Sequence, residues 1–532
     1  MSMSMSIDVL IVGAGPSGLV LATELARRAV NFRIIDSKPA SSPTSRSFTL
    51  HARTMEMFHD IGLSHTFLKE GLQNHGFLFN FQGQPTRPRL DFEHLDTAFP
   101  FILMLSQDRI ESTLLDHLST QYDVHVDWNT TLTNLSFEES QHAYSAIIQL
   151  PDGARQQVHP KWIAGCDGVH SKTRVEAGLS LEGEMYEDII QLMDAHVNGF
   201  QGDDDRVHYY MSKNKFLFLA RLPNDMHRIL VSDKRDVGEL DIEEARQVFQ
   251  DVVDSFLEGV TLDTPKWVSK WRVWKKLAKT YTKMNVVLVG DAVHTHSPSG
   301  GQGMNCGMQD AYNLGWKLAL VVQGKAASAL IKNYESERKR IGAQVVAGSD
   351  AIHNVILAHG KGLKGRLELT KKEGWHDEAV QRISGLSYHY RDVEPLSSDL
   401  EERSGARAGE RAVDVELEDE IRLHDVIRGP GFTLLLASGA DVKVAEMLDM
   451  IRVARSGLGK DVKVVVVGKV ADLPEGAADQ CIADKRGGFE ERYGTTDGGH
   501  AILVRPDGYI AIHLALGEQK TMHDTIQRIL CR

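Results

Sequence analysis

Apolar and polar positions at the start of the chain follow a strand–helix–strand order. Residues 7–12 form a short apolar run of strand type, residues 17–29 have apolar positions at helical spacing, and residues 32–35 form a second apolar run. A glycine-rich turn, 13–18, joins the first strand to the helix, and the second strand ends on Asp36, which could accept hydrogen bonds from a ribose. This order of strand, G-x-G-x-x-G turn, helix, strand and acid predicts a dinucleotide-binding unit.

Each residue of this turn has a physical reason in a dinucleotide site. Gly13 permits the tight turn, Gly15 lets the backbone approach a pyrophosphate, and Gly18 allows the helix to pack closely against the strand. The start of the helix, with Pro16 and Ser17, offers unpaired N–H groups and a partial positive charge to phosphates. Glycines of an ordinary turn are the alternative, and the surrounding elements argue against it.

Further along, helical and strand patterns alternate. Residues 51–61 read as a helix with Gly62 as its C-cap, and residues 107–119 read as another helix. Residues 124–150 resemble a β-meander, and alternating segments within 186–275 predict a second, antiparallel sheet.

The second half of the chain begins with another strand that runs into a Gly-Asp pair, over residues 285–291. An amphipathic helix is expected over 308–322, and residues 325–400 are mostly helical in pattern. Residues 404–409 look like a linker. Beyond it, strand-like runs separated by helical stretches predict a small α/β domain over 403–532.

These patterns together predict an α/β fold (α+β overall) with several domains, as a chain of 532 residues is too long for one core. A Rossmann-like domain is expected to be discontinuous, and an antiparallel-sheet domain should supply the substrate site. The expected divisions are 1–185 with 280–345, 186–279, a helical segment and linker over 346–402, and 403–532.

Composition narrows the possible partners. Apolar residues make up 42% and charged residues 25%, which is ordinary for a globular protein. The net charge of −13 argues against a nucleic-acid or anionic-membrane surface, and no apolar stretch is long enough for a membrane span. The four cysteines form neither a C-x-x-C pair nor a metal-ligand spacing, so a reducing, cytoplasmic compartment is expected.

Three separate segments share one chemical logic. Asp167 lies between glycines at the end of a short strand, Asp291 follows Gly290 at the end of another, and both repeat the arrangement that ends on Asp36. Either Gly-Asp pair alone favours a plain turn. Together, and followed by the glycine-rich segment 300–305 ahead of a helix, they favour a cofactor that lies extended across one domain.

The segment that begins at Gly290 resembles the motif of a known protein family. The stretch Gly290–Asn305, continued by Met308–Leu318, is similar nearly residue for residue to the flavin motif of the single-component FAD-dependent aromatic hydroxylases, the para-hydroxybenzoate hydroxylase and phenol hydroxylase group. The resemblance covers essentially the whole chain, because 403–532 resembles the thioredoxin-like C-terminal domain of the phenol hydroxylase subgroup. Without C-x-x-C, dithiol exchange there is not expected. A structural role or a subunit interface, in a homodimer, is expected instead.

The resemblance implies an FAD-binding role for residues along the whole first domain. Asp167 lies in the motif that the family shares between FAD and NAD(P)H, and the N–H groups of Gly303 to Asn305 would lie at flavin N1/O2, where a helix N-terminus stabilises negative charge. The cofactor-binding residues so implied are Gly13, Gly15, Pro16, Ser17, Gly18, Asp36, Arg46, Gln107, Asp167, Asp291, Pro298, Gly301, Gly303, Met304 and Asn305.

Two further expectations concern the sheet domain. Arg228 falls where the family often places an arginine against the flavin, with a solvated strand arginine as the alternative. Tyr210 could line the substrate pocket, with core packing as the alternative. Ala220 and Leu222 occupy places where the benzoate hydroxylase has a carboxylate-binding serine and arginine. A small benzoate is therefore not expected, although the neighbouring Arg221 leaves some room.

No metal site is expected. His294 and His296 are spaced i, i+2 on a loop without an acid-rich partner motif, which is a poor metal arrangement, and loop packing near the flavin is favoured over catalysis. Cys306 reads as a small packing residue. No side chain can be named from the sequence as the base for a phenol.

The reaction that the resemblance implies is an NAD(P)H- and O2-dependent hydroxylation. NADPH or NADH would reduce bound FAD, and a C4a-hydroperoxyflavin would then hydroxylate a phenolic or polyketide-type aromatic ring. Baeyer–Villiger oxidation, epoxidation or dearomatisation in secondary metabolism is the alternative outcome. A catalytically silent FAD-binding sensor or scaffold is an alternative of a different class.

Overall fold

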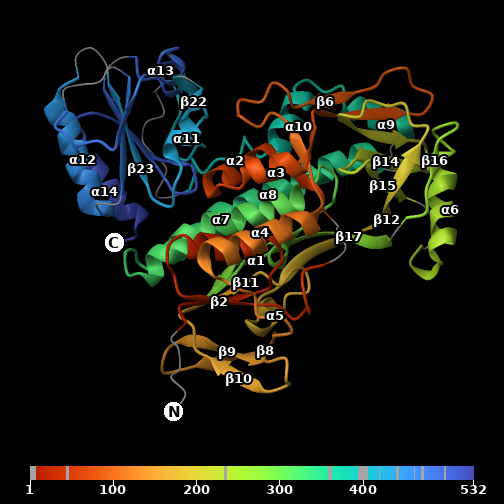
Figure 1. The fold of residues 1–532 in the computed structure, drawn as a ribbon, viewed down its shortest axis with the longest axis horizontal. Coiled ribbons are helices and arrows are strands. Elements are labelled where there is room, and N and C mark those ends of the chain that lie inside the picture. Colours follow the sequence, from red (N-terminus) through yellow and green to blue (C-terminus); the bar gives the residue numbers. More distant parts are fainter. Residues whose placement is uncertain are drawn as a thin grey trace.

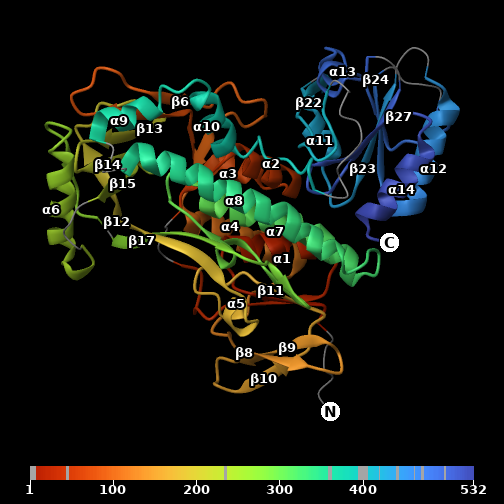
Figure 2. The ribbon, with the colours of Figure 1, turned by 180° about the vertical axis from the view of Figure 1, so that it is seen from behind.

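The computed structural model is a mixed α/β protein in which two long helices run through the centre, side by side, from the C-terminal domain to a large sheet (Figures 1 and 2). The sheet with β2 and β11, and the small sheet of β8, β9 and β10, lie beneath these helices in both views. The structure describes residues 7–42, 47–232, 237–265, 267–357, 362–393, 405–418, 420–438, 442–459, 462–468, 473–496 and 499–532.

The N-terminal unit is built on a sheet with the strand order β18-β19-β11-β1-β2. Strands β1, β2, β11 and β19 are parallel, and β18 is antiparallel. Parallel strands are buried on both faces, which accounts for their continuous apolar sequences. The predicted strand–helix–strand unit is confirmed, because α1 connects β1 to β2. These elements are β1 (Val9–Val12), α1 (Pro16–Ala26), β2 (Phe32–Ile35), β11 (Trp162–Gly165), β18 (Thr282–Lys283) and β19 (Val286–Leu288).

Helices α4 (Gln107–Tyr122) and α7 (Gln302–Val322) pack against α1. A Cβ at Gly315 of α7 would lie 2.3 Å from the Glu24 Cβ of α1, so glycine allows this close approach. Helix α7 begins at Gln302, ahead of the predicted start at residue 308.

Smaller elements complete the N-terminal unit. The predicted meander is confirmed as β8, β9 and β10, and the predicted helix before Gly62 is confirmed as α2, with Gly62 as a left-handed C-cap. A further small sheet has the order β3-β7-β4. These elements are β3 (Thr49–Leu50), α2 (Ala52–Ile61), α3 (Ser64–Glu70), β4 (Leu72–Asn74), β7 (Ile102–Met104), β8 (Thr131–Glu138), β9 (Ala143–Gln149), β10 (Arg155–Val158) and α5 (Lys172–Glu176).

The large sheet has the strand order β20-β17-β12-β15-β14-β13-β5-β6, with β16 beside β12. It takes β5 and β6 from outside the range 186–279 that the sequence predicts for it. Strand β5 pairs in parallel with β13, a long-range contact that a local pattern does not reveal. The strands are β5 (Gly76–Phe81), β6 (Arg89–Asp91), β12 (Leu181–Asn198), β13 (Arg206–Met211), β14 (Phe216–Arg221), β15 (Met226–Ser232), β16 (Thr261–Leu262), β17 (Val268–Ala278) and β20 (His294–Thr295).

The two faces of this sheet have different neighbours. Ile229 and Val231 of β15 face α6 (Ile242–Val253). Phe218 and Leu230 face the opposite way, into a core shared with α8 (Leu330–Leu357), α9 (Gly362–Leu369) and α10 (Trp375–Ser384). This alternation follows from the period of two in a strand.

The C-terminal domain contains a mixed sheet of order β25-β24-β23-β26-β27, with α12 and α14 together on one face and α11 and α13 on the other, as expected for a thioredoxin-like domain. Strands β23, β24 and β25 are parallel, and β26 and β27 are antiparallel additions. The elements are β21 (Glu416–Glu418), β22 (Ile421–Arg422), α11 (Leu423–Ile427), β23 (Thr433–Ser438), α12 (Val444–Leu458), β24 (Lys463–Gly468), β25 (Gln480–Ile482), α13 (Gly488–Tyr493), β26 (His500–Val504), β27 (Ile510–Ala515) and α14 (Gln519–Ile529).

The predicted linker 404–409 is instead packed against this domain wherever the structure describes it. Ala406 N–H donates to the Arg492 carbonyl oxygen at 3.0 Å, and Gly409 N–H donates to the Ile510 carbonyl oxygen at 2.8 Å. Its small residues allow this close packing. Because glycine and alanine are also frequent in flexible linkers, the composition alone predicts a linker here. In the part of the chain that the structure describes, every helix is too short or too polar to cross a membrane.

Candidate cofactor and substrate site

The segments that the sequence singles out meet at one place. A Cβ at Gly290 or at Gly307 would lie 2.6 Å from Ser17 Oγ, at the start of α1. A Cβ at Gly13 would lie 2.4 Å from the carbonyl oxygen of Cys166. The structure therefore brings the first glycine turn, the turn after β11 and the segment around α7 into contact.

The first turn of α1 is accessible within a buried surrounding. Gly15, Pro16 and Ser17 are half-buried, whereas the flanking residues are buried. A Cβ at Gly18 would lie 1.9 Å from the carbonyl oxygen of Gly13, but a Cβ at Gly15 would meet nothing within 4 Å. Gly18 is thus required for packing, and Gly15 leaves a space over a helix N-terminus, where a pyrophosphate fits.

Asp36 holds the glycine turn in place. Ala14 N–H donates to one carboxylate oxygen at 2.8 Å, and Lys38 N–H donates to the other at 2.9 Å. Each carboxylate oxygen has a second lone pair, so these bonds are compatible with a ribose hydroxyl as a further donor.

Two more predicted residues have structural partners. Asp167 accepts hydrogen bonds from the Thr173 N–H and hydroxyl, both at 2.9 Å, and so anchors the start of α5, a role that the sequence does not indicate. Gln107 begins α4 and donates to Glu111 at 2.8 Å. Arg46 lies outside the described residues.

The start of α7 is the second accessible helix N-terminus. Gly301, its N-cap, has a φ of 65°, which favours glycine. Pro298, Gly303 and Met304 are half-buried, and Asp291 is exposed, although most of the segment around them is buried. The first-turn N–H groups of a helix have no partner within that helix, so this end can receive an electron-rich edge of a ligand.

Asn305 uses its side chain to fix the neighbouring strand. Its Nδ2 donates to the Thr49 carbonyl oxygen at 2.9 Å, and its Oδ1 accepts from His51 N–H at 2.9 Å. The cofactor role implied for Asn305 therefore rests on its backbone N–H.

Two imidazoles, that of the buried His51 and that of the half-buried His296, lie beside this helix start. Burial lowers the pKa of His51 to about 3. Burial, and then the charge of His294, lower the pKa of His296 to about 4. Both rings are uncharged near neutrality, so they add no positive charge to the site.

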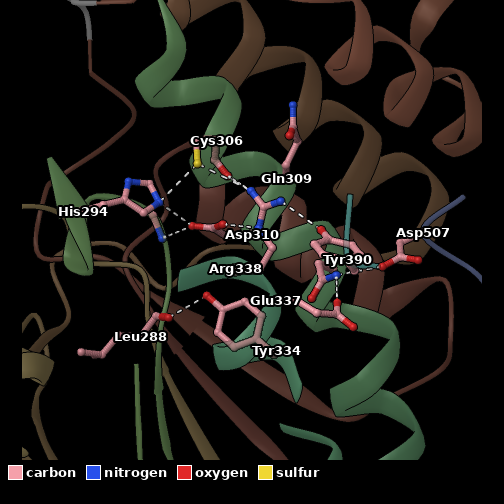
Figure 3. A network of polar contacts seen from close by, with 12 residues as sticks. Leu288, His294, Cys306, Gln309, Asp310, Tyr334, Glu337, Arg338, Tyr390 and Asp507 are labelled. Carbon is pink, nitrogen blue, oxygen red and sulfur yellow. Dashed lines mark hydrogen bonds and ion pairs between the residues drawn. The ribbon is translucent and has the colours of Figure 1, made fainter. Parts of the chain in front are cut away.

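A buried ion-pair cluster joins α7 to β20 and α8 (Figure 3). The Asp310 carboxylate pairs with His294 Nε2 at 2.7 Å and with Arg338 Nε at 2.6 Å, and all three side chains are at most 1% exposed. Burial alone would lower the pKa of His294, but Cys306 and Asp310 raise it well above its ordinary value. This cluster cannot be predicted from the sequence, because no local pattern joins His294 to Arg338 on α8.

The cluster also accounts for a group of possible metal ligands. His294, Cys306 and Asp310 offer ligand atoms that lie within 4.8 Å of one another. The bonds of Asp310 to His294 and Arg338 make this arrangement an ion-pair cluster, because two cationic partners already surround the carboxylate.

Arg228 lies buried between the large sheet and β3, so the alternative of a solvated strand arginine is wrong. Its guanidinium carbon lies 4.7 Å from the centre of the Phe48 ring and 5.5 Å from that of Trp267. The residue after Phe48, Thr49, donates to the Gly301 carbonyl oxygen at 3.1 Å. The structure therefore brings Arg228 next to the elements that hold the start of α7.

A cavity of about 580 Å³ opens beside Arg228, between the N-terminal unit and the large sheet. This volume lies in the range of about 300–1,000 Å³ that is usual for ligand sites. Charged and apolar side chains line it together, and Asp194 is the charged residue that the large sheet contributes. The other charged lining residues, from the end of α3 and the start of α4, are Lys69, Glu70, Asp108 and Arg109, and the apolar ones are Leu105, Leu222, Pro223, Met226 and Trp267.

The structure does not bring Tyr210 to this cavity. Its ring packs against Phe256 and His208, on the face of the sheet that is covered by α6. Burial raises the pKa of Tyr210 to about 12, which suits the packing role. Its neighbour Tyr209 faces the other way, among Phe79 and Phe218.

The site fits FAD on the chain's own geometry. One helix start, at Gly15, has an open space for a pyrophosphate, and Ser17 connects it to the segment before α7. The other helix start, at Gly303, is accessible and lies close to the aromatic wall around Arg228. Two anion-receptive helix ends linked in this way suit an extended dinucleotide with a flavin at its second end.

Comparisons with known families and relatives agree with this geometry. The family model described as FAD binding domain matches residues 6–349, and the model described as aromatic-ring hydroxylase, C-terminal, matches residues 405–532. Pentachlorophenol 4-monooxygenase of Sphingobium chlorophenolicum is 41% identical over 528 residues, 98% of this chain and 97% of that protein. 6-Methylpretetramide 4-monooxygenase of Streptomyces rimosus is 30% identical over 95% of this chain and 90% of its own.

Solved structures share the fold. The anhydrotetracycline hydroxylase from Streptomyces rimosus superposes with a TM-score of 0.77 at 26% identity, covering 98% of this chain and 99% of the other. Aklavinone-11 hydroxylase, solved with FAD and aklavinone, has a TM-score of 0.80 at 23% identity over the full length of both chains. The chain therefore belongs to the FAD-dependent aromatic-ring monooxygenases.

Proposed function

We propose that this monooxygenase hydroxylates a phenolic ring bound in the cavity beside Arg228. The observation that carries the proposal is the cavity's position, next to the residues that hold the start of α7 and lined by Trp267, Met226 and Leu222. The 41% identity to a pentachlorophenol monooxygenase supports a substituted phenol over a fused polyketide ring system.

We further propose distinct roles for the chain's residues. Backbone N–H groups at Gly15 and at Gly303 to Asn305 bind the pyrophosphate and the electron-rich edge of the flavin. Bound FAD, reduced by NADH or NADPH, supplies the activation of O2 that places one oxygen atom on the ring. Leu222, Met226 and Trp267 orient the ring and exclude water from it, and Arg228 holds Asp194 in the cavity wall.

The proposed division of labour follows the domains. Residues 1–185 with 280–345 bind the cofactor, 186–279 with β5 and β6 bind the substrate, and 403–532 brace the central helices. The homodimeric state and the cytoplasmic location expected from the sequence stay predictions. Sedimentation and cell fractionation are their tests.

The test is a substrate screen that couples NAD(P)H oxidation to product detection by mass. Phenol, 4-nitrophenol and pentachlorophenol are offered to the FAD-loaded protein under ¹⁸O2. We expect a product with one ¹⁸O atom on the ring. NAD(P)H consumption that yields only peroxide with all three phenols would contradict the proposal.

A further inference from the structure

Asp194 and Arg228 are direct partners across neighbouring strands. They are opposite each other in the pairing of β12 with β15. Arg228 Nε donates to one carboxylate oxygen of Asp194 at 2.5 Å, and an Nη of Arg228 donates to the other at 2.9 Å. Such a two-point bond fixes both side chains and balances their charges.

The two partners differ in their access to the cavity. The side chain of Arg228 is 0% exposed, whereas that of Asp194 is 14% exposed and forms part of the cavity lining. A ligand in the cavity therefore meets the carboxylate, and the guanidinium lies behind it between Phe48 and Trp267.

Two other arginines near this part of the sheet are not placed to bind a carboxylate group of a ligand in the cavity. Arg221 points to the opposite side and pairs with Asp204 and Asp225, both at 2.8 Å. Arg109, which also lines the cavity, is 55% exposed and pairs with Glu70 at 2.9 Å. Lys69, the other lysine or arginine that lines the cavity among the described residues, is exposed as well. Because both side chains are solvated, their charges contribute little to binding a ligand carboxylate.

We propose that Asp194 determines substrate specificity by selecting aromatic rings that carry a hydroxyl group and by excluding rings that carry a carboxylate. A hydroxyl can donate to the accessible oxygen of Asp194, whereas a ring carboxylate would face a like charge in a site of reduced dielectric. This inference rests on the proposed function, because it takes the cavity as the substrate chamber.

The first experiment uses the unmodified, FAD-loaded protein and two probes of nearly the same shape, the uncharged 4-hydroxybenzamide and the anionic 4-hydroxybenzoate. Dissociation constants come from the change in flavin absorbance on titration. We expect the amide to bind at least about tenfold more tightly, which corresponds to roughly 1.4 kcal/mol. Equal or tighter binding of the benzoate would overturn the inference.

The second experiment reverses the preference. Asp194→Asn keeps the shape of the side chain and leaves the charge of Arg228 without this counter-charge. We expect its benzoate-to-amide affinity ratio to rise about tenfold or more, and the double variant Asp194→Asn/Arg228→Gln to return close to the original ratio. Asp204→Asn, which removes the same charge from the Arg221 pair outside the cavity, is the matched control and should leave the ratio unchanged.

The outcomes separate this inference from the proposed function. An unchanged ratio in Asp194→Asn, or an equal change in Asp204→Asn, overturns the inference while hydroxylation of phenols continues. If neither probe binds and no phenol stimulates NAD(P)H oxidation, the proposed function fails first. Should Asp194→Asn not fold, the probe pair on the unmodified protein still decides.

Discussion

Arg505 of the C-terminal domain donates to both carboxylate oxygens of Glu337 on α8, at 2.7 and 2.9 Å. Each side chain is 2% exposed. Lys317 of α7 reaches the same carboxylate at 2.6 Å, so the last domain supplies a charge to the two central helices. Figure 3 shows Glu337 next to Arg338 on α8. Arg338 in turn pairs with Asp310, which belongs to α7.

Glu337→Gln should therefore destabilise the whole protein. The change leaves Arg505 and Lys317 buried with one counter-charge fewer, and breaking a buried pair in this way costs about 3–5 kcal/mol. Urea unfolding measured by circular dichroism checks this. Glu368→Gln, which removes the partner of Lys371 in an exposed pair, should change stability by less than about 1 kcal/mol. Equal effects of the two changes would contradict the role given to Glu337.

The carboxyl group of Glu337 also predicts that the protein loses stability at acidic pH. Burial alone would raise the pKa of Glu337, but Arg505 and Lys317 lower it to about 2, from the ordinary value of 4.5. A depressed pKa stabilises the folded state above the unfolded-state value, and this contribution is lost as the pH falls toward the folded-state value. Between pH 4.5 and 2 the unmodified protein should lose stability that Glu337→Gln does not lose.

His294 predicts the opposite dependence of the unfolding free energy on pH. Its pKa is raised, so its pairing with Asp310 contributes stability that is fully present below pH 6.5 and is lost as the pH rises through the folded-state value. His294→Gln should remove this alkaline loss while lowering stability at pH 6, near that ordinary value. The measurement is the unfolding free energy of both proteins at a series of pH values. Parallel curves for the two proteins would show that His294 is not charged in the fold.

Gly15→Ala and Gly18→Ala should separate cofactor binding from folding. A methyl group at Gly15 meets nothing within 4 Å, so we expect a folded protein whose FAD affinity falls about tenfold or more, as the methyl takes up pyrophosphate space. At Gly18 the methyl would lie 1.9 Å from a carbonyl oxygen, and the protein should not fold. FAD fluorescence titration and thermal unfolding are the readouts. Full FAD affinity in Gly15→Ala would place the pyrophosphate elsewhere.

Tyr210→Phe should leave the binding of 4-hydroxybenzamide unchanged, because the ring lies on the face covered by α6. A fivefold or greater loss, about 1 kcal/mol, would return Tyr210 to the substrate site. The titration is the one used for the unmodified protein.

The sequence predicts the parts of the site that depend on backbone. Gly13 and Gly18 stand where the backbone turns and packs too closely for any other residue type, as the pattern requires, whereas the pyrophosphate role of Gly15 stays a prediction. Parallel strands and α1 follow from apolar periodicity for the same reason: the signal lies within one segment.

What the sequence does not predict depends on partners far along the chain. The sequence leaves open whether Arg228 is buried or solvated, because its partners Asp194, Phe48 and Trp267 come from distant segments. Tyr210 and Tyr209 are neighbours, and which of them faces α6 depends on the register of β13, which long-range pairing sets. His294 and Arg338 likewise meet only through the packing of α7 on α8.

The contact of Arg505 with Glu337 also has a consequence for synthesis on the ribosome. Glu337 and Lys317 are made long before the hairpin between β26 and β27 emerges, and until then their buried positions lack the charge that Arg505 brings. The cofactor unit of this chain cannot reach its final packing during translation until nearly all of the C-terminal domain has been made. Folding of the two units is thus coupled in time, and a nascent chain halted before residue 505 would be a natural target for chaperones.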